Sequence, residues 1–117
     1  MFRAAVIGAA GIIAGSIATA GSVSAAPAYD VCGEAEYVTD LEVSLYHGQP
    51  PADPQAAAAR AQLFGANAPA EIKTDAVIEG YAETAVLDGV PVSFVYSLDP
   101  AIQAWGDVMD WHTDHCL

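Results

Sequence analysis

Apolar and polar residues repeat with a helical period in four stretches of the chain. In the first, residues 30–47, one side is apolar and the other carries Glu36, Asp40 and His47. Residues three and four apart share a face of an α-helix, so this stretch predicts an amphipathic helix. Gly48 and the two prolines after it predict where the helix ends. The apolar side is made of Val31, Ala35, Val38, Leu41 and Leu45.

A second helix is predicted to begin at Asp53-Pro54. An aspartate followed by proline supplies an N-cap and a residue suited to the first helical position. The segment is rich in alanine and continues to Leu63 and Phe64, with Gly65 as its expected end. A helix of this composition can approach a neighbour closely but buries little area.

A third helix is predicted to begin near Ala68-Pro69-Ala70-Glu71 and to end at Asp88-Gly89. The wheel separates an apolar face from an acidic one, and we expect the apolar face to be buried and the acidic face to lie in water. The apolar face holds Val77, Ile78, Tyr81, Ala82 and Ala85, and the acidic face holds Asp75, Glu79 and Glu83.

The last helix is predicted from Asp99-Pro100, again an N-cap followed by proline, to about His115. Residues 88–97 are expected to be irregular or a short extended segment, because Pro91 interrupts an apolar run. The pattern predicts an all-α fold, a small bundle of about four helices. On the last helix an apolar stripe of Ile102, Trp105, Met109, His112 and Cys116 is expected to face the core, opposite Asp107, Asp110 and Asp114.

The amino-terminal segment has the layout of a secretory signal peptide. Arg3 is followed by an uncharged apolar stretch, and Val23-Ser24-Ala25 fits a cleavage site before Ala26. A later site would follow Ala28, and an uncleaved membrane anchor is the alternative. The residue run before Cys32 does not fit a lipid-anchor site. We therefore expect residues 1–25 to be removed and 26–117 to form one domain, secreted or held in the cell envelope.

Cys32 and Cys116 are the two cysteines of the chain. They lie near opposite ends of the expected mature protein, and an oxidising compartment favours their pairing. We predict one disulfide between them that closes the bundle. No Cys-x-x-Cys pair is present to indicate redox or metal chemistry.

The charge excludes some classes of partner. Without Arg3 the chain keeps 2 basic and 15 acidic side chains, a net charge of −13. Nucleic acids and anionic lipid surfaces are bound through Lys and Arg, so we expect no nucleic-acid partner and no stable membrane insertion after cleavage. The simpler interpretation is that the negative charge serves only to keep the protein soluble.

Two sets of residues were weighed as ligands. His112 and His115, three apart near the chain end, could reach one metal ion, but histidines near a helix C-terminus also complement the helix dipole. We expect His112 to be a packed structural residue and His115 to be more exposed. Tyr46-His47 and the other tyrosines could ligate haem, although no spacing specifies such a site. The sequence therefore predicts no metal residues, no cofactor and no identified cofactor-binding set.

The sequence shows no catalytic motif of a hydrolase or a nucleotide-binding enzyme. The serines of the expected mature chain lie outside any Gly-x-Ser-x-Gly elbow, and no phosphate-binding glycine loop is present. We therefore predict no catalytic residues and no enzyme.

The chain resembles small exported helical proteins of actinobacteria, including mycobacteria and their relatives. The resemblance covers most of residues 30–117 and is carried by an alanine-rich signal, an early cysteine, the Ala-Pro-Ala-Glu-Ile-Lys-x-Asp segment at 68–75, and a last helix with Trp and Cys near its end. It implies a helical fold and an exported location, and it implies no catalytic residues.

The function expected from the sequence is that of a secreted, noncatalytic binding or interaction protein. Its partner would be a protein or an apolar small molecule, bound on its surface or in a small cavity between helices. The alternative is a haem or metal carrier that uses His112, His115, or the Tyr and His of the first helix.

Overall fold

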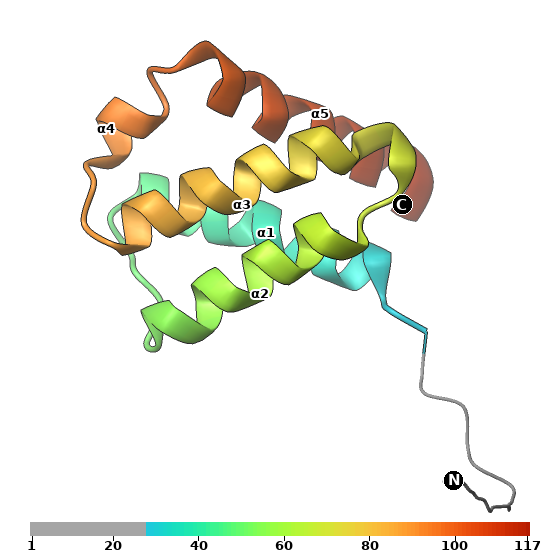
Figure 1. Cartoon of the computed structure of the whole chain (residues 1–117), viewed down its shortest axis with the longest axis horizontal. Helices are drawn as coiled ribbons and strands as arrows, with labels where there is room; N and C mark the ends of the chain where they lie inside the picture. Colours follow the sequence, from blue (N-terminus) through green and yellow to red (C-terminus); the bar gives the residue numbers. More distant parts are fainter. Residues whose placement is uncertain (1–27) are drawn as a thin grey trace, which may run out of the picture.

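The structure is a computed structural model that describes residues 28–117, and the predicted signal peptide and its cleavage site lie outside them. The described chain is all-α, which confirms the predicted helical bundle (Figure 1). It contains no β-strand within residues 28–117. The elements are α1 (Val31–Tyr46), α2 (Pro54–Asn67), the 3-10 turn η1 (Ala70–Ile72), α3 (Lys73–Leu87), α4 (Val92–Val95) and α5 (Asp99–Cys116).

Local sequence signals set most helix ends. The side chain of Asp30 accepts a hydrogen bond from the Gly33 N–H at the start of α1, and Asp53 accepts one from Ala56 at the start of α2. These contacts satisfy N–H groups that have no partner within the helix. Asp99 differs from the prediction, since it lies in the first turn of α5 and makes no capping hydrogen bond.

Gly48 and Gly89 end α1 and α3 as the sequence predicts. Their φ angles are +70° and +107°, a region that side chains with a Cβ rarely adopt. Gly65, predicted to end α2, instead lies inside this helix, which continues to Asn67. Gly65 is buried, and a Cβ there would lie 3.1 Å from the Cα of Val77 on α3. This glycine therefore serves the close packing of two helices.

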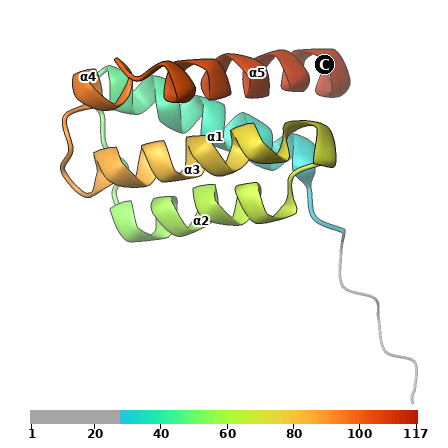
Figure 2. The ribbon, with the colours of Figure 1, turned by 45° about the horizontal axis from the view of Figure 1, so that its top comes forward.

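Helix α3 is the centre of the bundle. It packs against α2, α5 and α1, and α4 follows at its carboxyl end. Figure 2 shows α3 between α2 and α5, with α1 alongside α3. The side of α3 that faces these neighbours is therefore buried, while its outer side keeps exposed residues.

The face of α1 that the sequence predicts to be buried is buried. Ala35 and Val38 are at most 1% exposed, while Glu36 and Asp40 are exposed. These residues pack with the fully buried Phe64 of α2 and with Ala76 of α3 in the main core. The hydrophobic periodicity of the first helix thus gave its orientation correctly.

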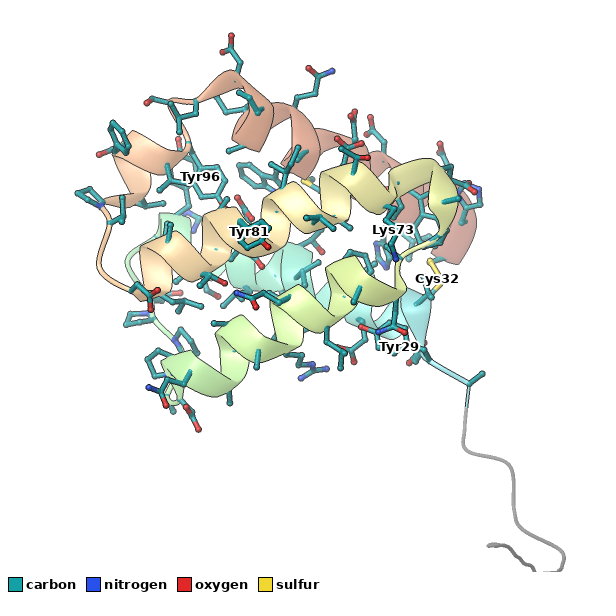
Figure 3. The ribbon with its side chains drawn as sticks, viewed as in Figure 1. Tyr29, Cys32, Lys73, Tyr81 and Tyr96 are labelled. Atoms are coloured by element: carbon teal, nitrogen blue, oxygen red, sulfur yellow. A yellow bond between two sulfur atoms is a disulfide. The ribbon has the colours of Figure 1, made fainter. Side chains whose placement is uncertain are left out.

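The orientation predicted for α3 is wrong. Its expected water-facing residues Glu79 and Glu83 are at most 1% exposed, whereas Tyr81, expected in the core, is 67% exposed (Figure 3). Since α2, α1 and α5 surround this helix, its acidic face is directed into the protein. The small residues Ala76 and Gly80 permit the close approach of its neighbours.

The buried face of α5 is rotated from the predicted stripe. Ala101, Ala104 and Val108 are buried, while Ile102 and Met109 are 47% and 43% exposed. Small alanine side chains let α5 lie close to α3, and this close contact outweighs burial of the larger residues on the neighbouring face.

The predicted disulfide is present. Cys32 and Cys116 are bonded, with their Cα atoms 5.6 Å apart and a separation of 84 positions in the sequence (Figure 3). The bond joins the start of α1 to the end of α5. It fixes the first and last helices of the bundle side by side.

Residues 88–97 were expected to be irregular or a short extended segment. They are irregular apart from one helical turn, α4, and contain no extended strand. Pro91 precedes this turn, where its missing N–H costs nothing. No helix within residues 28–117 has both the length and the apolar character needed to cross a bilayer.

Candidate metal centre

Three glutamates from two helices meet inside the bundle. Glu42 comes from α1, and Glu79 and Glu83 come from α3. One carboxylate oxygen of each can be chosen so that the three oxygens lie within 4.8 Å of one another. This is the one such group of potential metal ligands in residues 28–117.

The backbone positions these side chains. Glu79 and Glu83 are four residues apart, so they lie one above the other on α3. Glu42 follows Leu41 on the inner side of α1, and both are buried. Contact between α1 and α3 brings the third carboxyl group to the first two.

The cluster is shielded from water and lacks hydrogen-bond donors. Glu42, Glu79 and Glu83 are each at most 1% exposed. None of their six carboxylate oxygens accepts a hydrogen bond from an N–H or O–H group of the described chain. Buried polar groups without partners are rare and costly, so such a cluster requires a counter-ion or bound protons.

Burial and mutual repulsion favour the neutral form of these acids. Burial, reinforced by the negative charge of Glu42, raises the pKa of Glu79 from 4.5 to about 10. Burial and the charges of Glu79 and Glu42 raise the pKa of Glu83 well above its usual value. Burial also raises the pKa of Glu42, while its contacts with Tyr96, Glu83 and Glu79 oppose this effect. Without a cation, the cluster therefore holds protons at neutral pH.

Tyr96 closes one side of the cluster. It follows α4, is 7% exposed, and points inward in Figure 3. Its hydroxyl lies against Glu42, and burial followed by the charge of Glu42 raises the pKa of Tyr96. The hydroxyl is buried and has no hydrogen bond of good geometry. A fourth oxygen is thus present beside the three carboxyl groups.

Aromatic rings surround Tyr96. Its ring centroid lies 6.4 Å from that of Tyr46 on α1 and 6.0 Å from that of Trp105 on α5. Tyr46 and Trp105 meet edge to face at 5.9 Å. The rings of Tyr46 and Trp105 hold the Tyr96 ring between α1 and α5.

The two basic side chains of the described residues bind elsewhere. Arg60 forms two hydrogen bonds to Glu34, at 2.7 and 2.9 Å, and its guanidinium lies 3.6 Å from the ring centre of Tyr37. Lys73 donates to the backbone oxygen of Ala66. Neither of these two side chains neutralises the glutamates.

The acidic row of α3 continues toward its amino end. Asp75 is half-buried and lies one turn before Glu79, whose pKa its charge helps to raise. Burial raises the pKa of Asp75, and Asp107 of α5 raises it further. The two aspartates extend the negative potential from the cluster toward the protein surface.

The histidines considered from the sequence lie apart from this cluster. His112 is half-buried and His115 is exposed, as expected. The ring of His115 stacks on Trp111 at 4.7 Å, and its Nε2 lies 3.5 Å from Glu71. Neither His112 nor His115 belongs to a group of three or more potential metal ligands within residues 28–117.

The side chains of Tyr46 and His47 have different contacts. His47 is exposed, and its Nδ1 lies 2.8 Å from the backbone oxygen of Val43. Tyr46 is 55% exposed and packs at the edge of the aromatic group. The two side chains do not form a shared ligand pair.

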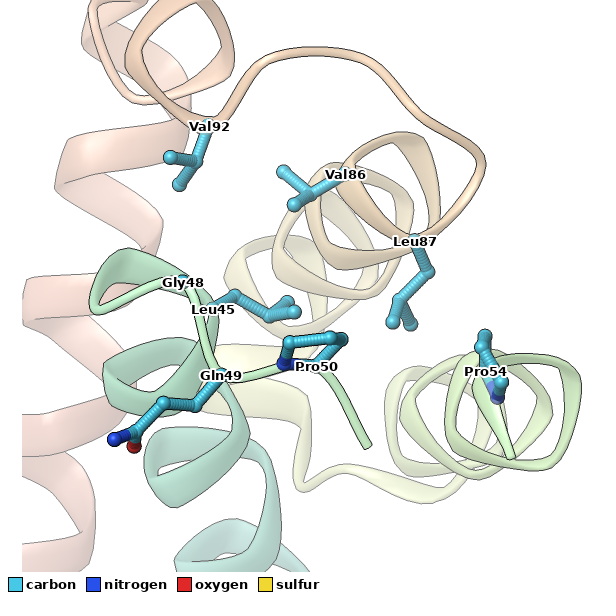
Figure 4. A pocket seen from close by; sticks show the side chains of 8 residues that line it. All are labelled: Leu45, Gly48, Gln49, Pro50, Pro54, Val86, Leu87 and Val92. Atoms are coloured by element: carbon cyan, nitrogen blue, oxygen red, sulfur yellow. The ribbon is translucent and has the colours of Figure 1, made fainter. Parts of the chain in front are cut away.

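An apolar pocket opens one helical turn beyond the carboxyl cluster (Figure 4). Leu45 and Val86, the next-turn neighbours of Glu42 and Glu83, line it together with Val92 at the start of α4. Its volume is about 200 Å³.

A larger apolar groove lies over α3, α4 and α5. Its volume is about 380 Å³, and its lining includes Tyr81, Phe94 and Leu98. Phe94 is 60% exposed and Leu98 is 46% exposed. The groove is a surface feature, separate from the enclosed glutamates.

Sequence reasoning missed the glutamates because it assigned them to water. A signal was nevertheless present, since Asp75, Glu79 and Glu83 repeat every four residues without a lysine or arginine to pair with them on that face. Like charges at this spacing destabilise an isolated helix. Such a row is therefore a pattern that a bound cation could explain.

No protein-family model, no curated protein and no solved structure matches this chain.

Proposed function

We propose that this protein is an exported, noncatalytic binding protein that holds a metal cation between Glu42, Glu79 and Glu83. The observation that carries the proposal is the complete burial of three carboxyl groups that have no N–H or O–H partner. This retains the carrier alternative considered from the sequence and moves its ligands from histidine to glutamate.

The donor atoms favour a hard cation. Carboxylate oxygen is the preferred ligand of hard cations, while nitrogen and sulfur donors, which suit softer metals, are absent from this cluster. Oxygen ligands on opposite sides of such an ion are about 4 to 5 Å apart. One oxygen from each of the three glutamates is therefore close enough to the others to contact the same ion.

The competing explanation is a set of acids that share protons. A protonated carboxyl group can donate a hydrogen bond to its neighbour, so the cluster could be structural. The two explanations differ in what a Glu→Gln change does. Glutamine keeps the shape and supplies a donor, so a structural cluster tolerates it, whereas a cation site loses a charged ligand.

Export is supported by the signal-like layout of residues 1–25 and by the Cys32–Cys116 bond, which suits an oxidising compartment. The resemblance to exported actinobacterial proteins agrees with this location. A binding role is supported by the burial of the three carboxyl groups, which suits a site that encloses a small ion.

Terbium(III) provides a direct test, because energy transfer from nearby Tyr or Trp makes the bound ion luminescent. Purified protein is stripped with a chelator and titrated with Tb³⁺ and, separately, with Ca²⁺, using calorimetry for both. We expect one Tb³⁺ per chain in the wild type. Glu79→Gln and Glu83→Gln should stay folded and lose this binding, and Glu36→Gln, at an exposed position of α1, should keep it.

Binding should also protect the fold. A saturating ion at 100 times its dissociation constant adds about 2.7 kcal/mol to the free energy of unfolding. Absence of any saturable site in the wild type, or equal binding by Glu36→Gln and Glu79→Gln, would contradict the proposal.

The apolar groove favours a second candidate, the binding of an apolar small molecule. Its volume falls in the lower part of the range of ligand pockets, and apolar residues dominate its lining. Native mass spectrometry of the exported protein should then detect a bound lipophilic molecule that Phe94→Ser removes. Ser97→Ala, a nearby exposed change, is the control.

A further inference from the structure

We infer that Tyr96 is the fourth oxygen ligand of the glutamate site and that the site takes a trivalent cation of the ferric iron type. This inference rests on the proposed cation-binding function. It adds the class of the ion and a residue from a third segment of the chain.

The first argument is the position of Tyr96. Its hydroxyl is buried beside Glu42 and lacks a hydrogen-bond partner of good geometry. Trp105 and Tyr46 fix the ring on two sides. If this position needed only an aromatic ring for packing, phenylalanine would be more stable there than tyrosine, because burying an unpaired hydroxyl is costly.

The second argument is charge. Three carboxyl groups converge without a neighbouring lysine or arginine. A trivalent ion bound by two carboxylates and the Tyr96 phenolate leaves no net charge when the third carboxyl group keeps its proton. A divalent ion is already neutralised by two carboxylates, so Tyr96 beside it would have to stay a neutral phenol; a phenolate there would leave an uncompensated negative charge inside the bundle, which is strongly unfavourable.

The third argument is ligand chemistry. Calcium sites use carboxylate, carbonyl and water oxygens, and magnesium usually keeps several waters. Tyrosine oxygen is an established ligand of iron in proteins. Three carboxyl groups with one phenol, in an enclosed site, therefore fit ferric iron better than either alkaline-earth ion.

Absorption spectroscopy tests the inference. Chelator-stripped protein is loaded from ferric nitrilotriacetate, and free iron is removed by gel filtration. We expect one iron per chain and a visible phenolate-to-iron charge-transfer band. Tyr96→Phe should lose that band and bind iron at least tenfold more weakly, while its circular dichroism and its Tb³⁺ luminescence titration show a folded protein with a glutamate site.

Tyr46→Phe is the matched control, because Tyr46 belongs to the same aromatic group but is 55% exposed. It should keep the band. Iron bound without a charge-transfer band, or a band that persists in Tyr96→Phe, overturns the role of Tyr96 while leaving the cation site intact. Failure of the wild type to bind either Fe³⁺ or Tb³⁺ overturns the proposed function itself.

Discussion

Gly80 of α3 lies directly against Ala61 of α2: a Cβ at Gly80 would lie 3.1 Å from the Ala61 carbonyl oxygen. This contact sets the approach of the central helix to α2. The nearby buried glycine, Gly65, approaches α3 from the other helix in the same way. Neither backbone can be displaced without moving a whole helix.

Gly80→Ala should therefore destabilise the protein by about 1 to 3 kcal/mol, since the new methyl group meets backbone atoms. Gly106→Ala is the matched control. It lies within α5 with no atom within 4 Å of the added Cβ, so it should stabilise by up to about 1 kcal/mol. Urea unfolding followed by circular dichroism measures both, and a stabilised Gly80→Ala would contradict the close packing.

The ion-free protein should lose stability as pH rises. The folded pKa of Glu79, about 10, exceeds its ordinary value of 4.5, so folding favours its proton. The resulting stabilisation is fully present below pH 4.5 and is lost as pH rises toward 10. Glu42 and Glu83 lie against Glu79, so the protonation of the three carboxyl groups is linked. The charge of Asp75 also raises the pKa of Glu79, and the Tyr96 hydroxyl lies beside the cluster.

Urea unfolding with a chelator at several pH values between 5 and 9 tests this dependence. Glu79→Gln should flatten the curve and raise the free energy of unfolding at pH 8 by about 1 kcal/mol or more, because it removes a buried ionisable group and adds a donor. Exposed Glu36→Gln should leave the slope unchanged. A wild-type stability that rises over this pH range would contradict the burial of neutral acids.

Removal of the disulfide should weaken the bundle without changing its helices. Cys32→Ser should lower the free energy of unfolding by about 2 to 5 kcal/mol, because the unfolded chain is no longer closed into a long loop. The double variant with Cys116→Ser should lose a similar amount, and reduced wild type should match it. Full stability in the reduced wild type would show that helix packing alone supports the fold.

The histidines near the end of α5 should be dispensable for cation binding. His112→Ala with His115→Ala should retain Tb³⁺ binding, because neither ring belongs to the glutamate cluster. His112→Ala should cost more stability than His115→Ala, since His112 is half-buried and His115 is exposed. Loss of ion binding in a folded double variant would move the site to the carboxyl end of the chain.

The sequence alone determined the helical class, most helix ends and the disulfide. These features depend on local chemistry or on a unique pair. Asp53 caps the first turn of α2 with its own side chain, Gly48 and Gly89 readily adopt positive φ, and the two cysteines had one another as partners. The orientation of α1 was also predicted, because large apolar side chains mark its inner face.

The tertiary structure decided which face of α3 and α5 is buried. On these helices the alanines and glycines permit close approach, and the gain from close packing outweighs the hydrophobicity of larger residues such as Tyr81 and Ile102. A helical wheel ranks side chains by polarity and contains no information on how near another helix can come.

The same cause produced the candidate site. Because α3 is enclosed by its neighbours, Glu79 and Glu83 turn inward, and only the contact with α1 adds Glu42. Tyr96 joins them from the connection after α4. The spacing of Glu79 and Glu83 could be read from the sequence, but their convergence with two distant residues depends on long-range packing, which no local pattern encodes.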